Sequence, residues 1–184
     1  GTMVAIPLVT NWGETLNHSF NNYNTSVTTT STTLVATGFI TSITTDQQGA
    51  VFLAASFNAY LSSTGSSSRN GEWQLYLDGA PVGQSVLRSI LTRDDTGGVS
   101  LFAIAEGVTA GTHTIELYHA SLDGDQGNKE IGTYNASLAA VSLVLDNGDE
   151  FAHVQTTTTG DTTSPSGETP VNWVGMEGFL AASY

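Results

Sequence analysis

An acidic loop between positions 123 and 130 carries the residue types that bind hard cations. Its oxygen-bearing side chains are Asp123, Asp125, Asn128 and Glu130, and glycines lie between them. Calcium takes several oxygen ligands, which a flexible loop of this composition can supply. The spacing is not that of an EF-hand, because no glycine occupies the sixth place and no glutamate the twelfth. Two interpretations stay open: a calcium loop and a solvated hairpin loop.

The four histidines, His18, His113, His119 and His153, do not suggest a metal centre. His113 and His119 have the parity of the apolar side chains between them, so they would face one side of a strand. Along that strand they would stand roughly 20 Å apart. We therefore expect structural or surface roles for all four.

No catalytic motif is present in the sequence. It has no Gly-x-Ser-x-Gly elbow, no His-Glu-x-x-His pair and no phosphate-binding loop. We expect no enzymatic activity, no catalytic residue and no cofactor other than the calcium considered above. Trp12 and Trp173 lie in loop-like contexts and can stack on sugars, whereas Trp73 alternates with leucines and is expected in the core.

Alternation of apolar and polar side chains predicts the strands that position these residues. Residues 72–78 and 111–120 alternate with the period of two that a half-buried strand requires. A continuous apolar run at 99–105 predicts a buried strand. Further strands are expected at residues 34–43, with a bulge at Gly38, and at 50–61, 82–91 and 133–145. No apolar series at helical spacing exceeds one turn, so we predict no helix.

Loop composition predicts how some of these strands are joined. Asp78-Gly79 is typical of a two-residue hairpin turn. The serine-rich stretch 62–70 predicts a second, flexible hairpin loop. Residues 17–33 are almost entirely Asn, Ser and Thr, and either an exposed strand at 25–33 or disorder fits them.

Charge and composition restrict the partners. The chain of 184 residues has four lysine and arginine residues against 17 acidic ones, for a net charge of −13. Such a charge repels phosphate backbones and anionic headgroups, so we expect neither nucleic acid binding nor membrane insertion. The chain has no cysteine, and its lysine-poor, threonine-rich surface favours an extracellular or cell-surface location.

An internal repeat relates the two ends of the chain. Residues 8–18 align with residues 143–153, and residues 51–57 align with residues 178–184. The N-terminal segment thus resembles the end of a domain, and the C-terminal segment resembles the beginning of one. We expect an edge or donor strand at residues 1–15, a β-sandwich domain at 16–145 and an extension resembling the start of a second repeat at 146–184.

The strand patterns resemble those of jelly-roll sandwiches of the C1q and tumour-necrosis-factor type, as found in bacterial surface and phage fibre proteins. Residues 111–117 resemble a penultimate strand, and residues 135–144 resemble a closing strand. This resemblance implies a non-enzymatic domain that assembles as trimers or repeats. The fold class we predict is all-β, an antiparallel jelly-roll β-sandwich with terminal strands that resemble the end and the start of a repeated domain.

Two functions fit these features. The first is a structural or adhesive subunit that assembles with copies of itself through the β-strand of Met3, Val4, Ile6 and Leu8. An open strand edge is a template for a neighbour's strand, and the result would be a filament or surface array, with a trimer or a monomer as alternatives. The second is a secreted carbohydrate-binding module that holds glycans on Trp12 or Trp173, with calcium in the acidic loop.

Overall fold

The computed structural model describes residues 16–62, 69–90, 96–123 and 130–144, whose regular structure consists of eight β-strands. Their side chains alternate between buried and exposed along most of their length, as the apolar patterning requires. The strands are β1 (His18–Thr29), β2 (Val35–Thr45), β3 (Gly49–Leu61), β4 (Arg69–Leu77), β5 (Ala80–Ile90), β6 (Gly97–Val108), β7 (Gly111–Ser121) and β8 (Ile131–Ser142).

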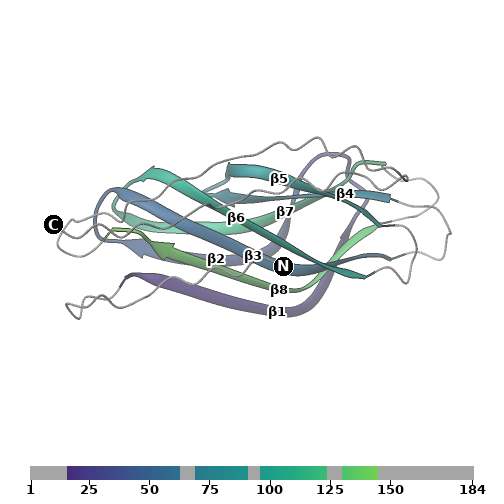
Figure 1. The fold of residues 1–184 in the computed structure, drawn as a ribbon, viewed down its shortest axis with the longest axis horizontal. Coiled ribbons are helices and arrows are strands. Elements are labelled where there is room, and N and C mark those ends of the chain that lie inside the picture. Colours follow the sequence, from purple (N-terminus) through teal and green to yellow (C-terminus); the bar gives the residue numbers. More distant parts are fainter. Residues whose placement is uncertain (1–15, 63–68, 91–95, 124–129, 145–184) are drawn as a thin grey trace, which may run out of the picture.

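The strands form two antiparallel four-stranded sheets (Figure 1). The first sheet has the order β1-β8-β3-β6, and the second has the order β2-β7-β4-β5. Strand partners are nested in sequence: β1 pairs with β8, β2 with β7, β3 with β6 and β4 with β5. This is the pairing of a long hairpin rolled into a sandwich, and it confirms the predicted jelly-roll fold class.

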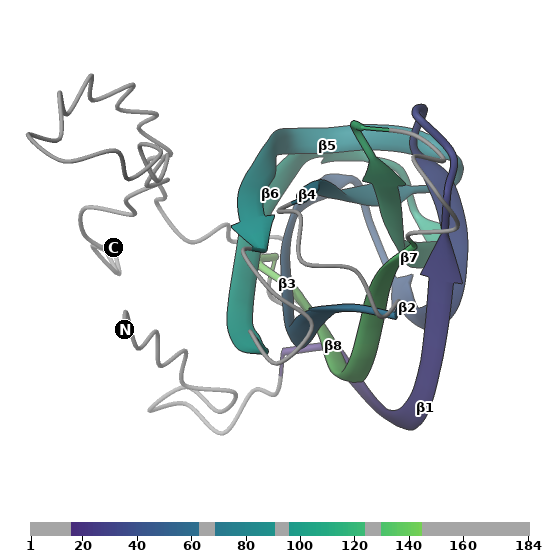
Figure 2. The ribbon, with the colours of Figure 1, turned by 90° about the vertical axis from the view of Figure 1, so that its right-hand side faces the viewer.

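The two sheets enclose the core and meet at both sides. Viewed from its end, the sandwich has β1 beside β2 on one side and β5 beside β6 on the other (Figure 2). All four of these are edge strands of their sheets. The β5–β6 side matters below, because a cavity opens there.

Trp73 occupies the core, as its alternation with leucines predicts. Its side chain has no exposed surface, and its ring packs against Phe57 with the ring centroids 5.5 Å apart. The indole Nε1 donates a hydrogen bond to Oγ1 of Thr133 on β8 at 2.8 Å. A buried indole nitrogen needs such an acceptor, so this bond ties the second sheet to the first.

The predicted hairpin turn at Asp78-Gly79 and the predicted bulge at Gly38 are both present. Asp78 and Gly79 both have positive φ, 49° and 80°, which is the conformation of a type I′ hairpin turn between β4 and β5. Gly38 also has a positive φ, and the β2–β7 register shifts between Ala36 and Ile40. The predicted hairpin and the predicted bulge are thereby confirmed.

Two expectations about connections need correction or completion. The hairpin predicted around residues 62–70 is wrong, because β3 and β4, the strands before and after it, lie in different sheets and do not pair. Of the two alternatives for residues 17–33, the strand is present, but β1 begins at His18 and ends at Thr29. Nearly all of its outward side chains are polar, so it carries little hydrophobic signal.

Candidate assembly surface

The first sheet is apolar on its outer face as well as on the face that lines the core. Along β3, Val51 and Leu53 belong to the main core, whereas Ala50 and Phe52 belong to a separate cluster on the other side of the strand. Phe52 is only 5% exposed in that outward position. An antiparallel sheet with one wet face would carry polar residues there, so this region of the sheet is buried on both faces.

Phe52 lies in an apolar row that crosses the sheet. It pairs with Val141 on β8 and with Ile104 on β6. These side chains are buried together with Leu16, which precedes β1, and Leu143, which follows β8. Burial of a large apolar side chain contributes about 1.5–3 kcal/mol, so the cluster stabilises this end of the sheet.

The next row along the sheet is also apolar but reaches solvent. Phe20 on the edge strand β1 pairs with Ala139, and the row continues to Phe102 on β6. Phe20 is 62% exposed, which is unusual for a phenylalanine in a strand. We call Phe20, Phe52, Phe102, Ile104 and Val141 the outer apolar face.

The outer apolar face ends at a polar row, which gives it a defined boundary. The row consists of Asn22, Ser137, Ser56 and Ser100, one from each strand of the first sheet. The Ser137 hydroxyl donates to Oδ1 of Asn22 at 2.6 Å. Only the part of this face around Phe20 and Phe102 reaches solvent, because Phe52, Ile104 and Val141 are buried within the chain.

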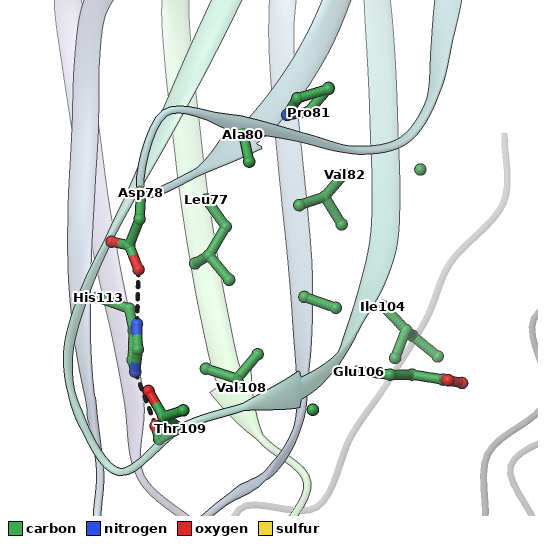
Figure 3. A pocket seen from close by; sticks show the side chains of 13 residues that line it. Leu77, Asp78, Ala80, Pro81, Val82, Ile104, Glu106, Val108, Thr109 and His113 are labelled. Atoms are coloured by element: carbon green, nitrogen blue, oxygen red, sulfur yellow. Dashed lines mark hydrogen bonds and ion pairs between the residues drawn. The ribbon is translucent and has the colours of Figure 1, made fainter.

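A cavity of about 470 Å³ opens between β5 and β6, near the turn that follows each of the strands β4 and β6 (Figure 3). Leu77, Val82 and Val108 line its interior, and Asp78 and His113 stand at one end. Leu77 and Val82 are only partly buried although they pack against the main core. This cavity, which we call the β5–β6 groove, therefore exposes the margin of the core at the edges of both sheets.

An ion pair closes one end of the β5–β6 groove. Nδ1 of His113 lies 2.7 Å from Oδ2 of Asp78, and the Thr114 amide donates to Oδ1 of Asp78 at 2.8 Å. The hydrogen bond to Asp78 raises the pKa of His113 against an opposing effect of burial. Burial disfavours the charged form of Asp78, but the bonds from His113 and Thr114 outweigh it and lower the pKa of that carboxyl.

His119 lies in the core and is hydrogen-bonded to a neighbouring threonine. Burial lowers its pKa to about 4, so the imidazole is neutral near pH 7. Its Nδ1 lies 3.0 Å from Oγ1 of Thr133. The same oxygen accepts the Trp73 indole proton, so its own hydroxyl proton is left to be donated to another group such as Nδ1. Both buried histidines thus have structural partners, as the sequence predicts.

The described part of the acidic loop uses its carboxylates as hydrogen-bond acceptors. Oδ2 of Asp123 accepts the Asn70 amide at 2.6 Å, and Oε2 of Glu130 accepts the Ser62 hydroxyl at 3.0 Å. Within the described ranges, no group of three or more histidine or acidic side chains is arranged to hold a metal ion. Asp125 and Asn128 lie outside those ranges, so calcium binding by this loop stays a prediction.

The outer face of the second sheet carries a pair of tyrosines. The rings of Tyr76 on β4 and Tyr118 on β7 stack with centroids 3.8 Å apart and an angle of 17° between their planes. Each side chain is partly exposed. Glu72 and Gln74 lie on the same face of β4, so the pair has hydrogen-bonding groups beside it.

Several residues that the sequence suggests for function lie outside the described residues. They are Met3, Val4, Ile6 and Leu8 of the proposed donor strand and Trp12 and Trp173 of the proposed glycan site. Both copies of the 8–18 repeat fall mostly outside as well. The roles of these residues stay predictions.

Sequence reasoning missed the outer apolar face, although a signal for it exists. Residues 50–55 read Ala-Val-Phe-Leu-Ala-Ala, an unbroken apolar run. Such a run in a strand indicates burial on both faces rather than on one. The β5–β6 groove and the Asp78–His113 pair had no comparable signal, because their residues come from separate strands.

Comparisons with known proteins give distant structural similarity only. No family model and no curated protein matches the chain. A structure of the Gt strain of infectious bursal disease virus matches 76% of this chain, at 14% identity and a TM-score of 0.42, and the chain spans 38% of that structure's length. The Eiger tumour necrosis factor of S. frugiperda matches 84% of this chain and 98% of its own, at 10% identity and a TM-score of 0.40.

Carbohydrate-binding modules are among the similar structures. A CBM36 module in complex with calcium and xylotriose matches 61% of this chain and 97% of its own, at 13% identity and a TM-score of 0.27. The jelly-roll assignment rests on the strand order of this chain itself. Among the described residues, no helix is long and apolar enough to cross a bilayer.

Proposed function

We propose that this chain is a non-enzymatic, extracellular structural or adhesive subunit that assembles with copies of itself through its N-terminal apolar segment. Residues 3–9 of one subunit dock on the first sheet of the next and extend it. Because such a head-to-tail contact does not close on itself, the product is a filament or a surface array.

The outer apolar face is the observation that supports this proposal best. Most of this face is buried within the chain, but the ring of Phe20 on the edge strand β1 is 62% exposed and continues the face into solvent. The small fraction of charged residues in the chain and its many threonines suit strands that pair side by side. Residues 3–9 contain no charged side chain, so the segment itself adds nothing to the repulsion between two subunits of net charge −13.

The strand order limits where a donated strand can pair. β8 resembles the N-terminal segment in sequence, but β8 has β1 on one side and β3 on the other. No edge is therefore left beside β8. A donated strand has to join the sheet at one of its ends, β1 or β6.

Deletion of residues 1–10 tests the proposal. Sedimentation velocity over a range of concentrations should show assembly of the full-length chain and a monomer for the deletion. Circular dichroism checks that the shortened chain keeps its β-sandwich. A full-length chain that stays monomeric at every concentration, or a deletion that only unfolds, contradicts the proposed function.

Glycan binding is a second candidate, and the stacked pair Tyr76–Tyr118 favours it. Aromatic ring faces on an exposed sheet, with carboxylate and amide groups beside them, suit the apolar faces and hydroxyls of a neutral sugar. A glycan array with the wild type, Tyr118→Ala and Trp12→Ala, each in calcium and in chelator, tests it. Strong binding that either variant abolishes would favour this function over self-assembly.

A further inference from the structure

We infer that the outer face of the first sheet binds a neutral oligosaccharide around Tyr60 on β3 and Tyr134 on β8. This part of the sheet lies beyond the polar row that borders the outer apolar face, and we call it the tyrosine face. The inference rests on the proposed function, because it gives an adhesive subunit a binding surface and a class of ligand. The tyrosine face is on the opposite sheet from the Tyr76–Tyr118 pair.

The ring of Tyr60 lies across the sheet in a fixed position. Tyr60 pairs with Gly132 of the neighbouring strand β8, and a Cβ at position 132 would overlap the Tyr60 ring. The Tyr60 hydroxyl is hydrogen-bonded to the Ser26 hydroxyl on β1, one strand further. The side chain therefore reaches from β3 over the glycine of β8 to β1. A ring that is already held in place loses little conformational freedom when a ligand binds.

The ring of Tyr134 stands at a right angle to that of Tyr60. The ring centroids are 5.3 Å apart, and the angle between the planes is 85°. Both tyrosines are only partly buried, so each keeps surface that a ligand can contact. Aromatic rings provide apolar faces against which the C–H groups of a sugar can pack, and the tyrosine hydroxyls add hydrogen-bonding groups.

Amide and hydroxyl groups border the two rings. Asn58 on β3 and Ser26 on β1 lie in the same row of the sheet as Tyr134. A bulge in β8 adds Asn135, which is exposed and has a positive φ of 50°. A positive φ is uncommon for a residue other than glycine, and bulges redirect side chains at functional sites. These groups can donate to and accept from sugar hydroxyls.

The tyrosine face is uncharged, in contrast to the second sheet. In the described structure, residues 20–28 of β1, 54–61 of β3, 97–102 of β6 and 131–139 of β8 include no charged side chain. On the second sheet, Glu116 lies directly beside Tyr76. A surface without charges favours a neutral ligand, and the net charge of −13 would repel an anionic polysaccharide.

The composition and width of the tyrosine face favour a sugar over a protein partner. Serine is depleted in protein–protein interfaces, which depend on a few large side chains in apolar pockets. Here serine and asparagine surround the rings instead. Neighbouring strands are about 4.8 Å apart, so a row that crosses all four strands is about 14 Å wide. A short oligosaccharide fits along such a row.

The test is isothermal titration calorimetry of the full-length chain with neutral hexasaccharides of glucose, xylose, mannose and N-acetylglucosamine. A hexasaccharide of galacturonic acid is the anionic comparison. At least one neutral sugar should bind and the anionic one should not. Tyr134→Ala and Asn58→Ala should each weaken that binding by about tenfold or more. Gln84→Ala, which removes an exposed amide from the second sheet, is the matched control and should bind like the wild type.

NMR locates the site without changing it. Full-length Ile6→Asp, which carries a charge in the assembly segment, should stay monomeric and give resolved spectra. The bound hexasaccharide should shift the backbone amide signals of Tyr134, Asn135 and Asn58. Shifts confined to β4 and β7, or no binding by any of the neutral sugars, overturn the inference.

The same measurements separate the inference from the proposed function. If deletion of residues 1–10 abolishes assembly and no neutral sugar binds, self-assembly stands and the glycan site on the tyrosine face falls. If a sugar shifts the signals around Tyr134 while the full-length wild type stays monomeric at every concentration, the glycan site stands and the proposed self-assembly falls.

Discussion

Asp78, in the turn between β4 and β5, accepts a hydrogen bond from Nδ1 of His113 on β7 at a distance of 2.7 Å. Nε2 of the same imidazole lies 2.8 Å from the carbonyl oxygen of Thr109. An imidazole that donates from both nitrogens is protonated, which agrees with its raised pKa. His113 thus joins the turns after β4 and β6, which flank the β5–β6 groove.

The first prediction is that this pair stabilises the fold only within a window of pH. The pKa of His113 is raised from 6.5, so its contribution is complete below that value and is lost as the pH rises through the folded pKa. The pKa of Asp78 is lowered from 3.8, so its contribution is lost as the pH falls through the folded value. In urea, the free energy of unfolding of Asp78→Asn should be about 1 kcal/mol lower than that of the wild type at pH 5.5. The difference should be smaller at pH 9. An equal difference at both pH values would show that the pair is not an ion pair.

The second prediction concerns the buried imidazole of His119. Its folded pKa of about 4 lies below the unfolded value of 6.5, so its contribution is complete above pH 6.5 and is lost as the pH falls toward 4. The wild type should lose about 3 kcal/mol over that range relative to His119→Gln, which keeps an acceptor for Thr133 but does not titrate. If His119→Gln loses as much stability as the wild type when the pH falls from 6.5 to 4, His119 is not the group whose protonation destabilises the fold.

The third prediction concerns the glycine beneath the core tryptophan. A Cβ at position 71 would overlap Cη2 of the Trp73 ring, which has no free space to move into. Gly71→Ala should therefore destabilise the fold by about 1–3 kcal/mol, as overpacking does. Gly98→Ala is the matched control, because nothing lies within 4 Å of its Cβ. Denaturant unfolding, followed by tryptophan fluorescence, compares the two variants.

Local chemistry made part of this fold predictable. Trp73 alternates with leucines, and Asp78-Gly79 has the residue types of a type I′ turn, so both features follow from neighbouring residues. β1 was harder to predict, because most of its side chains are Asn, Ser and Thr and a strand there gains its burial from β8. The placement of β3 and β4 in different sheets depends on strand pairing, which no local pattern encodes.

The candidate site was less predictable than the fold. The two partners in the Asp78–His113 pair are 35 residues apart in sequence, and the groove between β5 and β6 exists only after the sandwich has formed. The spacing of these residues in the sequence therefore could not show that they lie close together. The apolar run at residues 3–9 was visible, whereas the outer apolar face was missed although the run at residues 50–55 carries a signal for it.

The fourth prediction addresses calcium. If Asp123 and Glu130 complete a calcium loop with Asp125 and Asn128, they must give up some of their hydrogen-bonding capacity to Asn70 and Ser62. Calcium should then raise the melting temperature of the wild type, and Asp125→Asn should remove that increase. Asp46→Asn, at an exposed turn, is the control. A melting temperature that calcium does not change identifies the loop as a solvated one.

Cross-linking between subunits tests the central claim most directly. The chain has no cysteine, so single cysteines can be introduced as Leu8→Cys in one subunit and Phe20→Cys, on the exposed edge of the first sheet, in a subunit of different tag length. When the two are mixed and treated with a short bis-maleimide, the account predicts a hybrid product that carries both tags, and Ile6→Asp in the donor subunit should abolish it. The absence of a hybrid product at every concentration would contradict assembly through the donated strand.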